Sequence, residues 1–331
     1  MIESTRSGYL RRALSQDGNV LVVAVDAREV VEELLLRQQL MPPSLIHVGQ
    51  AALGALLLQS LSDPEENQRL EFRWSAQGPF GNLYAEVLGT GRVRSTVSYP
   101  QAEVDRLDEP LGDGVLQVRR FDSAGLPYSG IVTSSGRVGL DIVEYLERSE
   151  QKSCGMSLSV QVGARPDFVP PTEGAPTERI LSPFYVKSAV GYLIHILPQS
   201  TEARHAELLR MWDGFMADLG PLSKWVLPEG PPEEVSREIL NMLLPQEKWQ
   251  SLYGGETRFS CNCSQERAMR ALSLARQVER SAEERLREAG EAPPPSMAVE
   301  LPDGTVEVTC EFCGTRYRLA AEGLGGPDDI N

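Results

Sequence analysis

The chain has 331 residues, 41% of them apolar, and a formal net charge of −15 at pH 7. The apolar content supports a sizeable core and excludes a globally disordered protein. The acidic balance argues against nucleic-acid binding, which needs a basic surface, and against docking on anionic membranes.

The first 19 residues contain no apolar segment of the kind found in secretory signals, so the sequence predicts a cytoplasmic protein. The longest apolar stretch, residues 45–61, is interrupted by His47, Gln50 and Gln59. This stretch predicts a helix in the middle of a core and not a membrane span.

Residues 1–199 predict a large N-terminal domain of the α+β class, with mixed α and β elements and a mostly antiparallel sheet. An apolar strand is expected at 20–25, followed by a helix over 27–40 that Pro42 and Pro43 end. The further expected elements are strands at 70–74, 83–88, 92–99, 115–121, 128–133, 157–162 and 186–197, a short helix at 139–148 and a loop over 165–183.

Residues 200–257 predict a helical linker. Two amphipathic helices, 200–219 and 233–244, flank a segment rich in proline and glycine at 227–232. Isolated helices of this length are marginal in water, so the apolar face that includes Ile239 and Leu240 must bury against another element.

Residues 258–331 predict a small C-terminal module. A helix over 264–289 carries Arg and Glu at helical spacing, which is typical of a solvated surface. The proline run 293–295 ends it, and short strands are expected around Asp303 and the last two cysteines.

Two cysteine pairs are the chemically informative feature of this module. Cys261 and Cys263 form the first pair, Cys310 and Cys313 the second, and residues 264–309 separate them. Four thiolates can converge on one zinc ion in a closed site, with neighbouring sulfurs about 3.8 Å apart. No coordination position would then be left for a hydrolytic water. The fifth cysteine, Cys154, stands alone and is given no role.

Redox chemistry is a second use open to these thiols, because each pair is close enough to form a disulfide. Oxidation would expel the metal, and a module of this size has little core to replace it. The module should then unfold and release the helices of residues 227–255. Two alternatives remain: a zinc-stabilised interaction module that never switches, and a thiol–disulfide oxidoreductase using Cys310 and Cys313. The second is disfavoured because this pair follows an expected strand and not a helix start.

A family resemblance enters through the segments around the cysteines. Residues 258–267 and 308–317 closely resemble the redox switch of the bacterial heat-shock holdases known as the 33 kDa chaperonin family. Further segments, at 78–83, 91–94, 112–118, 128–132 and 149–151, are similar to that family's sheet turns and helix end. The resemblance covers residues 15–320.

The resemblance implies a chaperone that is not an enzyme and holds unfolded client proteins without ATP. One zinc ion per chain would sit on Cys261, Cys263, Cys310 and Cys313 in the reduced, idle state. Disulfides Cys261–Cys263 and Cys310–Cys313 would form in the oxidised, active state, which is a homodimer in the family. The spacing between the two pairs is longer here than is usual in the family. Zinc binding should tolerate that insertion, because loop-closure entropy grows slowly with length.

Overall fold

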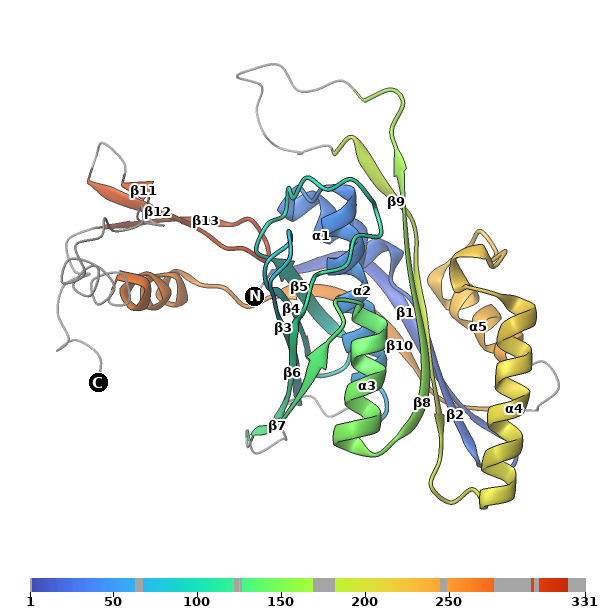
Figure 1. Ribbon diagram of the computed structural model, residues 1–331. Helices are drawn as coiled ribbons and strands as arrows, with labels where there is room; N and C mark the ends of the chain where they lie inside the picture. Colours follow the sequence, from blue (N-terminus) through green and yellow to red (C-terminus); the bar gives the residue numbers. More distant parts are fainter. Residues whose placement is uncertain are drawn as a thin grey trace. The chain divides into compact units, whose positions relative to one another are not determined.

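A computed structural model of the chain describes residues 2–62, 68–121, 125, 127–168, 182–244, 249–276, 299–300 and 304–320. The chain divides into two compact units. The larger unit spans Glu3–Ser260, and the smaller one comprises Met1–Ile2 and Cys261–Asn331. Figure 1 shows the elements of each, coloured along the sequence.

The larger unit is built on a ten-stranded sheet, ordered β7-β6-β3-β4-β5-β10-β1-β2-β9-β8. Its strands are β1 (Ile2–Ser15), β2 (Val20–Asp26), β3 (Arg69–Ala76), β4 (Leu83–Leu88), β5 (Arg92–Val97), β6 (Gly114–Phe121), β7 (Pro127–Ser134), β8 (Ser153–Ala164), β9 (Phe184–Ile196) and β10 (Trp249–Cys261). The pairings are mostly antiparallel, and β10 pairs with β5 in parallel. The predicted α+β fold is confirmed.

Three helices pack against the sheet: α1 (Arg28–Gln38), α2 (Pro42–Gln59) and α3 (Val138–Glu150). Helix α2 is buried along most of its length and contacts strands β4, β5, β8 and β9, so the prediction of a central core helix is confirmed. The expected role of the proline pair is wrong. Helix α1 ends before it, with Gln39 at φ 53°, and Pro42 and Pro43 begin α2. Proline suits the first helical turn because its fixed φ fits and its missing N–H is not needed there.

The sheet is covered on both faces at strand β2, because all seven residues of this strand are buried. Alternate side chains on a strand point to opposite faces. Val20, Val22 and Ala24 belong to an apolar cluster with helix α5 (Pro232–Leu243), which includes Ile239 and Leu240. The prediction that the apolar face of this helix is buried is therefore confirmed.

Further residues of the predicted linker join the same cluster. They come from helix α4 (Glu202–Leu219) and from the short helix η1 (Leu222–Lys224) with its following residue. Leu208 and Leu222 are buried there, and the ring of Trp225 stacks on Tyr192 of β9 with ring centroids 5.5 Å apart. Within the larger unit these segments pack on the sheet at β2 and β9, on the side where Figure 1 shows α4 and α5.

Two strands are missing from the sequence-based prediction. Strand β1 pairs with β2 from Tyr9↔Asp26 to Leu14↔Leu21, although its sequence carries several arginines. Strand β10 begins inside the expected linker and joins the sheet between β5 and β1. Both owe their extended conformation to hydrogen-bond partners on other strands, which a local pattern does not encode.

The smaller unit contains a three-stranded antiparallel sheet and a helix over residues 265–276. The strands are β11 (Val299–Glu300), β12 (Thr305–Thr309) and β13 (Arg316–Ala320). Its described core consists of Ala268, Leu272, Val306 and Leu319, with Val308 and Tyr317 packed against it. A core of this size does not hold a domain together without a staple. Residues 277–289 of the predicted helix, the proline run, and residues 169–181 of the predicted loop lie outside the described residues.

Among the helices within the described residues, none combines the length and hydropathy needed to cross a bilayer.

A pH dependence of stability follows from His47 on α2, whose side chain is 5% exposed. Its Nε2 donates to the carbonyl oxygen of Glu109 at 2.8 Å, and among the described residues its Nδ1 has no partner. Burial lowers the pKa of His47 from the ordinary value of 6.5. Below pH 6.5, His47 is protonated more readily in the unfolded chain than in the native chain. The free energy of unfolding therefore falls as the pH drops below 6.5. The slope is up to about 1.4 kcal/mol per pH unit.

Denaturant unfolding of the wild type and of His47→Gln, between about pH 5 and 7.5, measures this contribution. The variant should show a shallower loss of stability toward acid than the wild type. The pKa of His195 is also lowered, first by burial and then by Lys152. That contribution persists in both proteins, so the difference between their slopes reports His47. If the free energy of unfolding had the same pH dependence in both proteins, His47 would not be the source of this contribution.

Candidate metal centre

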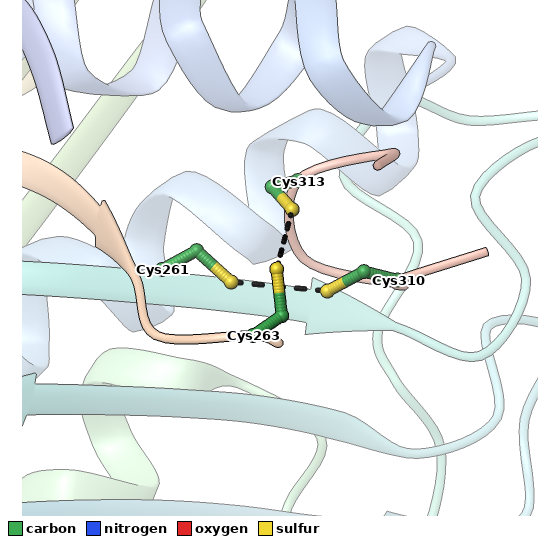
Figure 2. Close-up of side chains that lie close together, drawn as sticks. All are labelled: Cys261, Cys263, Cys310 and Cys313. Carbon is green, nitrogen blue, oxygen red and sulfur yellow. Dashed lines mark hydrogen bonds between the residues drawn. The ribbon is translucent and has the colours of Figure 1, made fainter. Parts of the chain in front are cut away.

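Four thiols of the smaller unit point toward one another (Figure 2), and their sulfur atoms all lie within 4.8 Å of each other. The Sγ atoms of Cys261 and Cys310 are 3.7 Å apart, and those of Cys263 and Cys313 are 3.4 Å apart. These distances are near the spacing of about 3.8 Å in a tetrahedral all-sulfur site. The cluster could therefore hold one metal ion after small movements of the side chains.

Local backbone structure brings the second pair into position. Cys310 and Cys313 lie in the turn between β12 and β13, where Cys310 N donates to the Thr315 carbonyl at 2.9 Å. Gly314 N donates back to the Cys310 carbonyl at 2.8 Å. Gly314 has φ 70°, in the left-handed region where a side chain is strained. The segment from Cys310 to Thr315 thus forms a tight knuckle that carries the second cysteine pair.

The first pair lies between a strand and a helix. Cys261 is the last residue of β10, and Cys263 precedes the helix over residues 265–276. Ser264 Oγ accepts a hydrogen bond from Arg267 N at 3.2 Å and so caps this helix. The Arg267 guanidinium donates to the Asn262 carbonyl at 2.8 Å. These two bonds hold the segment that carries the first cysteine pair.

Two side chains contact the sulfur atoms from outside the cluster. The Tyr317 hydroxyl donates to Cys263 Sγ at 3.1 Å, and Thr315 Oγ1 lies 3.1 Å from Cys313 Sγ. Sequence reasoning missed both residues. Thr315 could have been suspected from its position two residues after Cys313. Tyr317 reaches the first pair through the pairing of β12 with β13.

Crowding of the thiols sets their proton affinities. Hydrogen bonding to Cys261 and Cys313 raises the pKa of Cys310, while hydrogen bonds from Cys261 and Cys310 hold the pKa of Cys313 well below its usual range. The Cys313 thiolate is thus stabilised by hydrogen bonds from thiols that remain protonated. Four thiolates at this distance repel one another unless a cation lies between them. An all-sulfur donor set suits a soft metal ion better than magnesium or calcium.

Comparison with known proteins adds to this geometry. Residues 8–320 match the family model described as Hsp33 protein. The chain belongs to the Hsp33 family. The resemblance inferred from the segments around the cysteines is therefore confirmed, and the match extends over nearly the whole chain.

Individual relatives of this Hsp33-family chain support the same family assignment. A protein of Symbiobacterium thermophilum named 33 kDa chaperonin is 31% identical over 327 residues, which cover 95% of each chain. A protein of the same name from Thermus thermophilus is 29% identical, with 95% of this chain and 85% of that protein covered. A crystal structure of the 33 kDa chaperonin (heat shock protein 33 homolog) of Thermotoga maritima has a TM-score of 0.70 at 23% identity, covering 97% of both chains. It shows the same fold.

The remaining cysteine and the three histidines of this Hsp33-family chain lie in the larger unit. Cys154 is on β8, and burial raises the pKa of its thiol to about 12, so it is a poor nucleophile at neutral pH. His47 and His195 are buried, and His205 Nε2 lies 3.4 Å from Ser153 Oγ. Within the described residues, the group able to hold a metal consists of the four cysteines expected from the sequence.

The hydrogen bond from Tyr317 gives a test of how the cluster is supported. Tyr317→Phe keeps the ring packed on the small core but removes the donor to Cys263 Sγ. Loss of such an outer contact should weaken metal binding by about tenfold, the lower end of the usual range. Competition between the protein and a chromophoric chelator measures this affinity. Tyr128→Phe, in the larger unit, is the matched control and should leave it unchanged. Equal affinities in both variants would show that the Tyr317 contact does not support the cluster.

Proposed function

We propose that this chain is an ATP-independent holdase controlled by oxidation, idle with one zinc ion on its four C-terminal cysteines and active once they form disulfides. Its partners are unfolded proteins. As predicted from the sequence, the proposal includes a cytoplasmic location, a homodimer in the active state, and no enzymatic, nucleic-acid or membrane role. The observation that carries the proposal is the convergence of four sulfur atoms in a unit whose described core is very small.

Zinc would serve this unit as the main source of its stability. Four buried apolar residues make up the described core, and none of them is aromatic. Structural zinc contributes about 10–16 kcal/mol of apparent binding free energy in small modules. Removing the ion should therefore unfold the smaller unit rather than loosen it. The larger unit keeps its own extensive core.

Oxidation supplies the route by which the ion leaves. Four zinc-bound thiolates lose four electrons to form two disulfides; two molecules of hydrogen peroxide accept them with four protons and become four waters. Disulfide sulfurs are poor zinc ligands, so Zn²⁺ is released. The pairing Cys261–Cys263 and Cys310–Cys313 is taken from the family resemblance.

The pairing decides whether the unit comes apart. In the cluster, the sulfur–sulfur hydrogen bonds of 3.7 and 3.4 Å each join one cysteine of the first pair to one of the second. Disulfides along those contacts would keep the end of β10 tied to the knuckle. Disulfides within each pair leave the two segments free to separate, which is what release of a linker requires.

Peptide mapping after peroxide treatment tests the pairing. Digestion without reduction should give one peptide with Cys261 bonded to Cys263 and another with Cys310 bonded to Cys313. Cys154 should stay reduced, because its raised pKa leaves little thiolate to react with the oxidant. Cross-linked peptides joining Cys261 to Cys310 would contradict the proposed mechanism of release.

Oxidation and chaperone activity should rise together. Peroxide at raised temperature should release one zinc ion per chain, measured with a chelating dye, and should increase suppression of the aggregation of a heat-unfolded client enzyme. Cys154→Ser is the control and should behave like the wild type. Zinc loss without a gain in suppression would refute the switch. Equal suppression by reduced and oxidised protein would instead favour a constitutive interaction module.

The apolar surface under helix α5 is the proposed client site. Ile239 and Leu240 on this helix are fully buried against residues of β2 and β9, including Val22 and Tyr192. If α5 leaves when the smaller unit unfolds, both its own apolar face and the surface it covers become accessible. Contiguous exposed apolar surface of this kind binds unfolded proteins.

Loosening α5 without oxidation should partly activate the protein. Leu240→Ala removes a fully buried side chain and should cost about 2–5 kcal/mol of docking stability. The reduced, zinc-bound variant should therefore suppress client aggregation more than the reduced wild type. Arg237→Ala changes an exposed residue of the same helix and should leave the reduced protein idle. If Leu240→Ala is as inactive as that control, α5 does not cover the client site.

A further inference from the structure

Strand β10 fills a slot in the middle of the sheet, between β5 and β1. Its parallel register with β5 covers two residue pairs, Arg258↔Arg92 and Phe259↔Val93. The other pairings with a defined register in this sheet cover at least six pairs each. Arg258 N also donates to the Gly91 carbonyl at 2.9 Å. The ladder to β5 is therefore short, and the other edge of β10 pairs with β1.

Full burial along β10 is confined to its last residues. Thr257 is 1% exposed and Phe259 is 0% exposed. Upstream, Leu252 is 43% exposed, and Gln250 and Glu256 are exposed as well. Trp249, the first residue of β10, is partly buried and packs against the apolar cluster that includes helix α5. The segment 257–260 holds the downstream end in the sheet, and Phe259 is its fully buried apolar side chain.

The slot is built for close approach of a polypeptide backbone. A Cβ on Gly91 would lie 2.9 Å from the Glu256 carbonyl oxygen, and one on Gly8 would lie 2.7 Å from Thr257 Oγ1. Contacts this short are incompatible with a side chain at either position. At Gly91 the missing side chain lets the main chain of β10 approach closely, while Gly8 is also required because its Cβ position would clash with the Asp26 carbonyl oxygen.

The position of Phe259 adds a preference for an aromatic side chain. Its register partner Val93 is fully buried, and the guanidinium carbon of Arg37 lies 4.9 Å from the centroid of the Phe259 ring. A cation beside a ring face favours an aromatic group over an aliphatic one. Arg37 itself is held by Glu33, with a hydrogen bond of 2.7 Å.

We propose that the slot between β5 and β1 is a second client-binding site, which residues 257–260 occupy in the idle protein. Its ligand is an extended segment of an unfolded protein with an aromatic residue flanked by small or polar ones, as in the segment it replaces. Once β10 withdraws, β5 and β1 present unpaired N–H and C=O groups, and a client segment restores the ladder by strand addition.

This inference rests on the proposed function, because withdrawal of β10 follows unfolding of the smaller unit. A single residue, Ser260, separates Phe259 from Cys261. While the cysteine cluster is intact, β10 is held at its downstream end and its effective concentration at the slot is high. Once that end is free, the effective concentration of β10 at the slot falls, and its pairing with β5 and β1 competes with client segments on closer terms.

A labelled peptide of residues 250–260, which contains no cysteine, tests the slot in the full-length protein. Fluorescence anisotropy should show binding to the peroxide-oxidised protein at least about tenfold tighter than to the reduced, zinc-bound protein. The same peptide with Phe259→Ala should bind the oxidised protein about tenfold or more weakly, because it lacks the buried ring. Hydrogen exchange should show added protection at residues 92–94 when the wild-type peptide is bound.

Two protein variants distinguish strand addition from general stickiness. In Phe259→Ala the occupying segment is weakened, so the reduced variant should bind the wild-type peptide. The oxidised Arg37→Gln protein should no longer bind the wild-type peptide more tightly than the same peptide with Phe259→Leu. The second readout is a ratio of affinities, so it keeps the test decisive even if Phe259→Ala folds poorly.

The outcomes separate this inference from the holdase itself. Oxidised protein that suppresses client aggregation but binds the Phe and Ala peptides equally, or neither, overturns the slot and leaves the proposed function standing. Exchange of β10 between two copies, seen as a dimer that excludes the peptide, also overturns it. Absence of suppression after oxidation overturns the proposed function, and peptide binding by reduced Phe259→Ala then still supports the slot.

Discussion

In the proposed holdase, the attraction between one zinc ion and four closely spaced thiolates is the interaction that holds the smaller unit together. Without a cation, sulfur atoms within 4.8 Å of each other repel as thiolates, and the cluster keeps protons to limit that repulsion. With a soft divalent ion, the same proximity becomes the strongest contact in a unit whose described core has four buried apolar residues. Under the proposed function, order in this unit is therefore tied to the oxidation state of its cysteines.

The larger unit has no comparable dependence. Its central strand β2 is buried on both faces, and α2 contributes a nearly continuous apolar surface to the core. Helix α5 and strand β10 differ from this core in how they are attached. One is a surface helix that buries a single face. The other is a strand that pairs with β1 and, over two residue pairs, with β5, and most of its upstream residues are exposed. Elements of this kind detach at lower cost than the core they cover.

The covalent order of the chain connects these two properties. The sequence runs from α5 into β10 and then, through Ser260, into the first metal-site cysteine. A chemical change at the four sulfur atoms can thus affect helix α5, which covers apolar surface, and strand β10, which fills the slot between β5 and β1. Under the proposals above, the link acts by freeing the downstream end of β10, and withdrawal of β10 opens the sheet between β5 and β1.

The sequence by itself determined the cysteine site, the α+β class, and most helices and strands, because each is encoded within a few neighbouring residues. The close spacing within each pair, Cys261 with Cys263 and Cys310 with Cys313, already indicated a shared metal site. Tertiary structure alone decided that residues 249–261 form a central strand and that Tyr317 contacts Cys263. Both depend on hydrogen bonding between segments far apart in the chain, and local periodicity carries no record of which strands become neighbours.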